Sequence, residues 1–154
     1  METTAIAVVG SKSSGKTTTI EVLTRELTKR GYRIAAVKHI PEPNFTVDRT
    51  GKDTWRFAQS GAKTIISVAS NEIATIEKVK AKNFSLGDIL QRCEGNDIVF
   101  LEGFRELVGK SRGIYKIVAV KSPEEALEAV KSFKPILAFT GSYSTEKLNL
   151  KLPY

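Results

Sequence analysis

The chain has 154 residues, of which 41% are hydrophobic and 27% are charged, and its formal net charge is +7. These values are ordinary for a globular protein, and the length predicts one domain over residues 1–154 with a single core. No apolar run approaches the ~18 residues of a membrane span, and the sequence lacks the basic-then-apolar pattern of a signal peptide. The single cysteine, Cys93, excludes an internal disulfide, which suits a reducing compartment, so we expect a cytoplasmic protein. Because Cys93 is close to Ile89 and Leu90, we expect a packed thiol rather than a reactive one.

The basic balance favours a polyanionic partner. The Lys and Arg residues are scattered along the chain, without a dense block or interleaved aromatic residues, so nucleic acid is not the expected partner. A nucleotide with several phosphates is itself a polyanion and fits the same charge.

The first predicted elements are a strand over residues 4–9 and a helix over residues 18–30. Between them, Gly10 to Thr17 read Gly-Ser-Lys-Ser-Ser-Gly-Lys-Thr, which matches the phosphate-binding pattern G-x-x-x-x-G-K-[ST]. The order strand, glycine-containing loop, helix is the context that this motif requires. The sequence therefore predicts a nucleotide site at the start of the chain.

The chemistry of this loop follows from its residue types. The backbone N–H groups of about residues 13 to 18 are expected to point at a β-phosphate. Lys16 is expected to reach the β- and γ-phosphates, and the Thr17 hydroxyl is expected to bind Mg²⁺.

A second strand is predicted over residues 32–37, which places Lys38 and His39 at its carboxyl end. In open parallel sheets that edge is where ligands bind. Residues 40–52 are polar and contain two prolines, so they predict a long loop, and this loop carries Asp48.

A short helix is expected next, from residue 53 or 54 to 60. Two strand-like runs follow, over residues 64–69 and 72–77. Because only two residues separate these runs, they predict a hairpin, and a hairpin in the domain predicts a mixed sheet.

The rest of the chain alternates between helices and strands. Helices are predicted over residues 86–92, after Ser85, and 123–133, with Ser122 as the cap, and strands over residues 97–101, 115–120 and 136–140. This alternation predicts a doubly wound α/β fold, with a mostly parallel sheet flanked by helices as in P-loop NTPases and a β-hairpin after the second helix.

A phosphate loop needs an acidic residue for Mg²⁺ or water at the end of a neighbouring strand. Glu102 directly follows the apolar strand 97–101 and is the first candidate, with a surface glutamate as the alternative. Asp48 is the second candidate, with a solvated loop aspartate as the alternative. Asp97 begins the same strand at the opposite edge of the sheet, so we expect a structural role. For His39, structural and functional roles both remain open.

With these residues in place, the chain resembles the molybdopterin-guanine dinucleotide biosynthesis protein B (MobB) family. Four segments carry the likeness, in the family's order and spacing. They are the loop from Gly10 to Glu21; Gly31 to His39 with its Val-Lys-His end; Asp48 to Arg56 with its Asp-x-x-Gly-Lys-Asp run; and Asp97 to Phe104 with Glu-Gly-Phe.

The resemblance implies a P-loop homodimer that binds GTP with Mg²⁺, hydrolyses it slowly if at all, and assists the partner nucleotidyltransferase (protein A) that joins GMP to molybdopterin. It further implies that Asp48 and Glu102 serve the metal or water and that Lys38 and His39 flank the site. The residues that it assigns to the phosphates are Gly10, Ser11, Lys12, Ser13, Ser14, Gly15, Lys16, Thr17 and Thr18.

The chain also departs from the family pattern. Ile40-Pro41-Glu42-Pro43-Asn44 stands where members commonly have a further histidine and acid. No Asn-Lys-x-Asp motif for guanine is present, and Lys121-Ser122 occupies the end of the relevant strand, so GTP rather than ATP follows from the resemblance alone.

Two other functions use the same loop. A small-molecule kinase using ATP needs a lid, and residues 105–116, with Arg105, Lys110 and Arg112, are a candidate lid or alternatively a dimer edge. A metal-insertion or partition-type ATPase commonly has a lysine directly after the first loop glycine, where this chain has Ser11.

Overall fold

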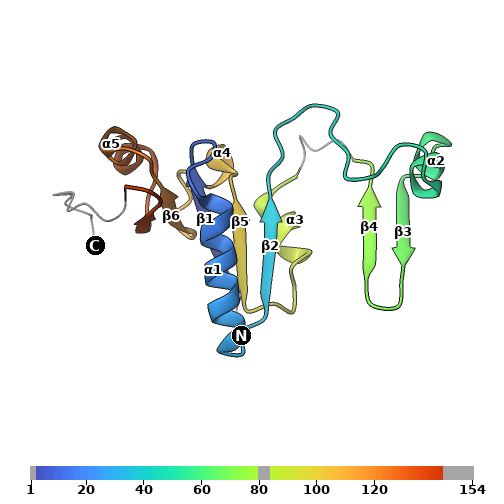
Figure 1. Ribbon diagram of the computed structural model, residues 1–154, viewed down its shortest axis with the longest axis horizontal. Helices are drawn as coiled ribbons and strands as arrows, with labels where there is room; N and C mark the ends of the chain where they lie inside the picture. Colours follow the sequence, from blue (N-terminus) through green and yellow to red (C-terminus); the bar gives the residue numbers. More distant parts are fainter. Residues whose placement is uncertain (1–2, 80–83, 144–154) are drawn as a thin grey trace. The chain divides into compact units, whose positions relative to one another are not determined.

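The computed structural model describes residues 3–79 and 84–143, which form two compact units (Figure 1). The first unit contains residues 3–39 and 86–143, and the second contains the described residues from Ile40 to Ser85. The phosphate loop lies in the first unit and the predicted hairpin in the second. The single domain expected over residues 1–154 stays a prediction.

The first unit is built on a five-stranded sheet in which every pairing is parallel. Its strands are β1 (Thr4–Gly10), β2 (Ile34–Lys38), β5 (Ile98–Glu102), β6 (Tyr115–Ala119) and β7 (Ile136–Thr140). The spatial order is β2-β5-β1-β6-β7, so β1 is central and the chain leaves it first toward one edge and later toward the other. The doubly wound α/β fold is confirmed.

Four helices of the first unit connect these strands. They are α1 (Lys16–Lys29), α3 (Leu86–Gln91), α4 (Arg105–Val108) and α5 (Pro123–Ser132). On one side of the sheet, Ile20 of α1 packs with Val8, Phe100 and Ile117, while Val99 and Leu101 on the opposite face of β5 are also fully buried. The apolar run of β5 was therefore a correct indication of a strand covered on both faces.

The second unit contains α2 (Asp53–Gln59) and the antiparallel hairpin of β3 (Thr64–Val68) and β4 (Ile73–Glu77). The hairpin is confirmed, but the expected mixed sheet is wrong, because β3 and β4 form a two-stranded sheet of their own. Ile65 is the buried hydrophobic residue of β3, whereas Ile66, Val68 and Ile73 are exposed. A short strand with one buried position pairs locally with its neighbour, whereas the parallel sheet uses strands that are apolar on both faces.

Two further features differ from the sequence analysis. The four-residue helix α4 was not predicted. Lys116, inside the apolar strand β6, is fully buried, and its ammonium donates to the carbonyl oxygens of Ser111 and, at 2.7 Å, Lys134. Burial lowers the pKa of Lys116, and the two carbonyls satisfy a charge that would otherwise be costly to bury.

No helix in the described ranges is long and apolar enough to cross a membrane.

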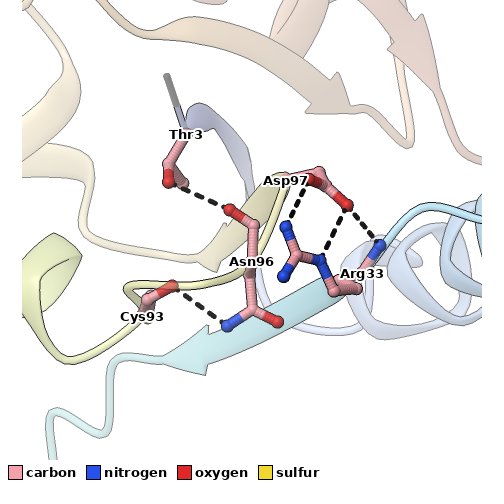
Figure 2. A network of polar contacts seen from close by, with 5 residues as sticks. All are labelled: Thr3, Arg33, Cys93, Asn96 and Asp97. Carbon is pink, nitrogen blue, oxygen red and sulfur yellow. Dashed lines mark hydrogen bonds and ion pairs between the residues drawn. The ribbon is translucent and has the colours of Figure 1, made fainter. Parts of the chain in front are cut away.

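Asp97 has the structural role that its position suggested (Figure 2). It precedes β5, and its carboxylate accepts hydrogen bonds from the Arg33 backbone N–H at 2.8 Å and from Arg33 Nη2 at 3.0 Å. These bonds lower the pKa of Asp97. Beside this pair, Asn96 donates to the Cys93 carbonyl at 3.0 Å. The Cys93 thiol is buried, which raises its pKa and confirms the expected packed thiol.

Replacing Asp97 by Asn tests this pair through its pH dependence. Because the folded-state pKa of Asp97 is lowered, its stabilisation is present above the unfolded-state pKa of about 3.9 and is lost as the pH falls through the folded value. We expect Asp97→Asn to lower the urea midpoint at neutral pH, and we expect the difference from wild type to shrink in acid. Glu21→Gln, an exposed position on α1, is the control. A midpoint difference that stays constant with pH would contradict the assignment.

Candidate functional site

The phosphate loop, residues 10–15, connects β1 to α1 and packs tightly against the ends of the neighbouring strands. Gly10 has φ of 152°, and a Cβ atom there would lie 2.3 Å from the Ala119 carbonyl oxygen of β6. At Gly141, after β7, a Cβ atom would lie 2.9 Å from the Ser14 carbonyl oxygen. Both close approaches require glycine, so the loop is held in one backbone path.

The amino end of α1 is open to an anion. Its N-cap is Gly15, which supplies no side-chain hydrogen bond, and its first turn contains no acidic residue. The first N–H groups of a helix lack intrahelical partners and carry partial positive charge. Thr17 and Thr18 lie in this turn, so the predicted phosphate-binding backbone starts the helix as expected.

The Lys16 ammonium folds over its own loop. Its Nζ donates to the carbonyl oxygens of Ser11 at 2.6 Å and Gly10 at 3.2 Å. Partial burial lowers the pKa of Lys16, an effect that Glu102 opposes and that the charges of Lys38, Arg105 and Lys121 reinforce. Positive charge is therefore concentrated at the end of the loop where Lys16 was expected to meet the β- and γ-phosphates.

Glu102 lies beside Thr17, and its predicted role at the metal or water stays a prediction. The Thr17 hydroxyl donates to Glu102 Oε2 at 3.0 Å and approaches Oε1 at 3.1 Å. The contact arises because β5 is adjacent to β1 in the parallel sheet, so Glu102 at the end of β5 reaches the start of α1. Lys38, opposite Glu102 in the β2–β5 register, places its Nζ at 3.5 Å from Glu102 Oε1.

His39 lies next to this group, and its backbone N–H donates to the Glu102 carbonyl at 3.0 Å. Its ring lies 5.2 Å from the Phe104 ring, in a tilted aromatic pair. The structure thus gives His39 a packing contact at the ligand edge, and its predicted place beside the nucleotide stays a prediction.

Asp48 belongs to the second unit, where its contacts are local. Its Oδ1 accepts hydrogen bonds from the Thr54 hydroxyl at 2.8 Å and from the Arg49 backbone N–H at 2.9 Å. These bonds tie the loop to the start of α2. The role of Asp48 at the metal or water stays a prediction.

A contact that the sequence did not predict joins the loop to the start of α5. Glu125 accepts a hydrogen bond from the Ser11 hydroxyl at 2.9 Å through Oε1 and from the Lys121 backbone N–H at 2.8 Å through Oε2. These bonds, the backbone one above all, lower the pKa of Glu125. Lys121 Nζ in turn donates to the Lys12 carbonyl at 3.0 Å.

The sequence did contain a signal for this contact. Ser122 and Glu125 have the S-x-x-E spacing of a capping box, in which the glutamate reaches back toward the start of its helix. In this protein the same carboxylate also reaches the phosphate loop, which only the tertiary structure reveals.

The donors at the loop fit Mg²⁺. Within the described residues, no group of three or more His, Cys, Asp or Glu residues is suited to hold a metal ion. Mg²⁺ is commonly bound through one or two protein oxygens, with phosphates and waters completing its coordination. The Thr17 hydroxyl and the Glu102 carboxylate, already in contact with each other, are such a pair.

Comparison with curated proteins gives close relatives. The chain is 35% identical over 103 residues to the molybdopterin-guanine dinucleotide biosynthesis adapter protein of Haemophilus influenzae, covering 66% of this chain and 57% of that protein. It is 35% identical over 122 residues to a putative adapter protein of the same name from Methanocaldococcus jannaschii, covering 77% of this chain and 48% of that protein. The chain thus matches about half the length of these relatives.

Solved structures agree with this similarity. A crystal structure of molybdopterin-guanine biosynthesis protein B matches with a TM-score of 0.68 at 32% identity, over 88% of this chain and 79% of that chain. The Bacillus subtilis MobB structure matches with a TM-score of 0.73 at 23% identity, over 97% of this chain and 87% of that one, and shows the same fold. A family model described as Molybdopterin guanine dinucleotide synthesis protein B matches residues 5–140. The chain therefore belongs to the molybdopterin guanine dinucleotide synthesis protein B (MobB) family.

Proposed function

We propose that the protein is a GTP-binding adapter in the biosynthesis of molybdopterin guanine dinucleotide and that it assists the partner nucleotidyltransferase, protein A. Family membership and the names of the relatives support the pathway. The single observation that carries nucleotide binding is the contact of Thr17 with Glu102 at 3.0 Å, directly beside the open amino end of α1. A hydroxyl and a carboxylate meet there at the end of the phosphate loop.

Different groups at the loop would bind different parts of the nucleotide. The backbone N–H groups at the start of α1 would bind the phosphates, and Lys16 would exchange the Gly10 and Ser11 carbonyls for phosphate oxygens. Thr17 and Glu102 would hold Mg²⁺, which neutralises phosphate charge when bound. Lys38, already paired with Glu102, would add positive charge to this edge of the sheet.

We propose that GTP hydrolysis is slow. In the first unit, Glu102 is the carboxylate beside Thr17, and it is occupied by that hydroxyl and by the Lys38 ammonium. A carboxylate held in this way orients a water molecule only weakly, so the hydrolysis that it supports is slow. Weak turnover fits an adapter, whose task is to bind a nucleotide and a partner.

We also propose that the protein acts as a homodimer through its hairpin. Ile66, Val68 and Ile73 of the β3–β4 hairpin are 58%, 75% and 69% exposed. Ile66 and Val68 are two residues apart on β3 and therefore point to the same face, and Val68 is directly opposite Ile73 on β4. The three side chains thus share one face of the hairpin. A two-stranded hairpin with an exposed apolar face is marginal by itself and gains stability from a covering chain.

The first test is titration calorimetry of GTP and ATP, with and without Mg²⁺, on wild type and on Lys16→Ala. We expect wild type to prefer GTP and to require Mg²⁺. Lys16→Ala is expected to weaken binding on the order of 100-fold, because charge-assisted bonds to phosphate are lost. Lys29→Ala, at the far end of α1, is the matched control. Equal affinity of Lys16→Ala and wild type would exclude the loop as the site, and an ATP preference would instead favour a kinase or ATPase.

Replacing Glu102 by Gln separates binding from hydrolysis. The amide oxygen still accepts from Thr17 and remains an oxygen ligand for Mg²⁺, whose other ligands are phosphates and waters, so we expect GTP affinity within about threefold of wild type. The loss of the negative charge is expected to lower the residual hydrolysis rate about tenfold or more, measured as phosphate release. Glu106→Gln, exposed on α4, is the control. If turnover is unchanged in Glu102→Gln, Asp48 becomes the candidate for positioning the water.

Sedimentation equilibrium tests the dimer. We expect wild type to be a dimer and the double variant Val68→Lys with Ile73→Lys to be a monomer, because two ammonium groups would have to be buried in the interface. Val22→Lys changes a residue that is 54% exposed on α1 and serves as the control. A double variant that remains a dimer would show that the hairpin face lies outside the interface.

A further inference from the structure

We propose that Arg105 binds the terminal phosphate of the nucleotide and acts as a second phosphate-binding cation beside Lys16. This inference rests on the proposed nucleotide binding and extends it to a residue for which the motif predicts no role. It also replaces the lid interpretation of residues 105–116 with a specific contact.

The backbone brings Arg105 to the ligand edge of the sheet. Only Gly103 and Phe104 separate it from Glu102 at the end of β5. Phe104 adopts the left-handed conformation, with φ of 56°, and α4 starts directly after it. A non-glycine residue in this conformation is uncommon, and here it turns the chain so that Arg105 begins a helix beside the loop.

Arg105 shares a cavity with the first residues of the phosphate loop. Arg105, Gly10 and Ser11 line one shallow cavity of about 100 Å³, together with Glu125 and Phe133. Gly10 and Ser11 are also the residues whose carbonyls the Lys16 ammonium contacts. The two cationic side chains therefore approach the same end of the loop from different elements.

The guanidinium is held weakly in its present position. Its central carbon lies 5.3 Å from the centroid of the Phe133 ring, a cation–π contact worth about 0.5–1 kcal/mol at an exposed site. Its positive charge helps to lower the pKa of Glu125, which lines the same cavity, but in the described part of the chain Arg105 forms no ion pair with a carboxylate. A weak apolar contact leaves the planar donor group available for a stronger one.

The charges around the loop favour this assignment. The positive charge of Arg105 acts on Lys16 together with those of Lys38 and Lys121, and it is opposed by Glu102 at Lys16 and by Glu125 at Arg105 and Lys121. Like charges gathered at an open site repel one another until an anion enters. The terminal phosphate carries the most negative charge of a nucleoside triphosphate, and arginine presents a fork that matches phosphate oxygens.

If Arg105 binds the terminal phosphate, it contributes to the affinity for GTP and not to the affinity for GDP. The start of α1 serves phosphates that GTP and GDP share, and Lys16 is expected to reach the β-phosphate as well as the γ-phosphate. A group that binds only the terminal phosphate distinguishes the two nucleotides. Calorimetry should therefore compare a non-hydrolysable GTP analogue with GDP, both with Mg²⁺, on wild type and on Arg105→Gln. Arg112→Gln is the matched control, since Arg112 is an exposed arginine in the segment after α4.

We expect Arg105→Gln to weaken binding of the GTP analogue about 10- to 100-fold, the range for a hydrogen bond to a charged group. GDP affinity should change less than about twofold, which also shows that the variant is folded. Arg105→Lys should lose part of the effect, because it keeps the charge but not the fork, and it provides a second test if Arg105→Gln is unstable.

Several outcomes would overturn the inference. Unchanged affinity for the analogue, or an equal loss for the analogue and GDP, would leave Arg105 as a side chain that only packs on Phe133. If wild type bound neither nucleotide, the proposed function would fail, and this inference with it. If wild type bound both nucleotides and Arg105→Gln did not discriminate between them, only the assignment of Arg105 would fail.

Discussion

The parallel pairing of β1 with β5 on one side and β6 on the other is the constraint on which the site depends. Parallel strands end at the same edge of a sheet. This edge therefore holds the loop after β1, Glu102 at the end of β5 and Lys121 after β6. The core fixes this edge: Val8, Phe100 and Ile117 pack beneath Ile20 of α1, the helix that starts at the loop. The burial that stabilises the sheet therefore also positions the phosphate site.

The loop is further fixed by contacts that involve no ligand. Gly10 approaches the Ala119 carbonyl too closely for any side chain, and Gly141 does the same at Ser14 and Val120. Glu125 accepts a hydrogen bond from Ser11, and Lys121 donates one to the Lys12 carbonyl. A loop held at several points has little conformational entropy left to lose when a phosphate enters, so more of the interaction energy appears as affinity.

The two ends of the first unit differ in their balance of charge. At the end away from the loop, Asp97 pairs with Arg33 and Asn96 binds the Cys93 carbonyl, so charge there is neutralised within the protein (Figure 2). At the loop end, Lys16, Lys38, Arg105 and Lys121 exceed the carboxylates Glu102 and Glu125. Positive charge left unbalanced at one edge is unfavourable for folding and favourable for binding a polyanion.

The sequence by itself determined the strand–loop–helix motif, the buried strand before Glu102, the hairpin and the structural role of Asp97. The first three features are local, since a glycine spacing, an apolar run and a two-residue turn each act over a few neighbouring residues. The role of Asp97 followed from its place at the start of a strand, although its partner Arg33 is distant in sequence. The sequence did not determine that the hairpin forms its own sheet, that Lys116 is buried, or that Glu125 and Arg105 reach the loop. Those facts depend on which strands become neighbours: Glu125 lies more than 100 positions from Ser11 in sequence, and it contacts the loop only because β6, which leads into α5, pairs with β1.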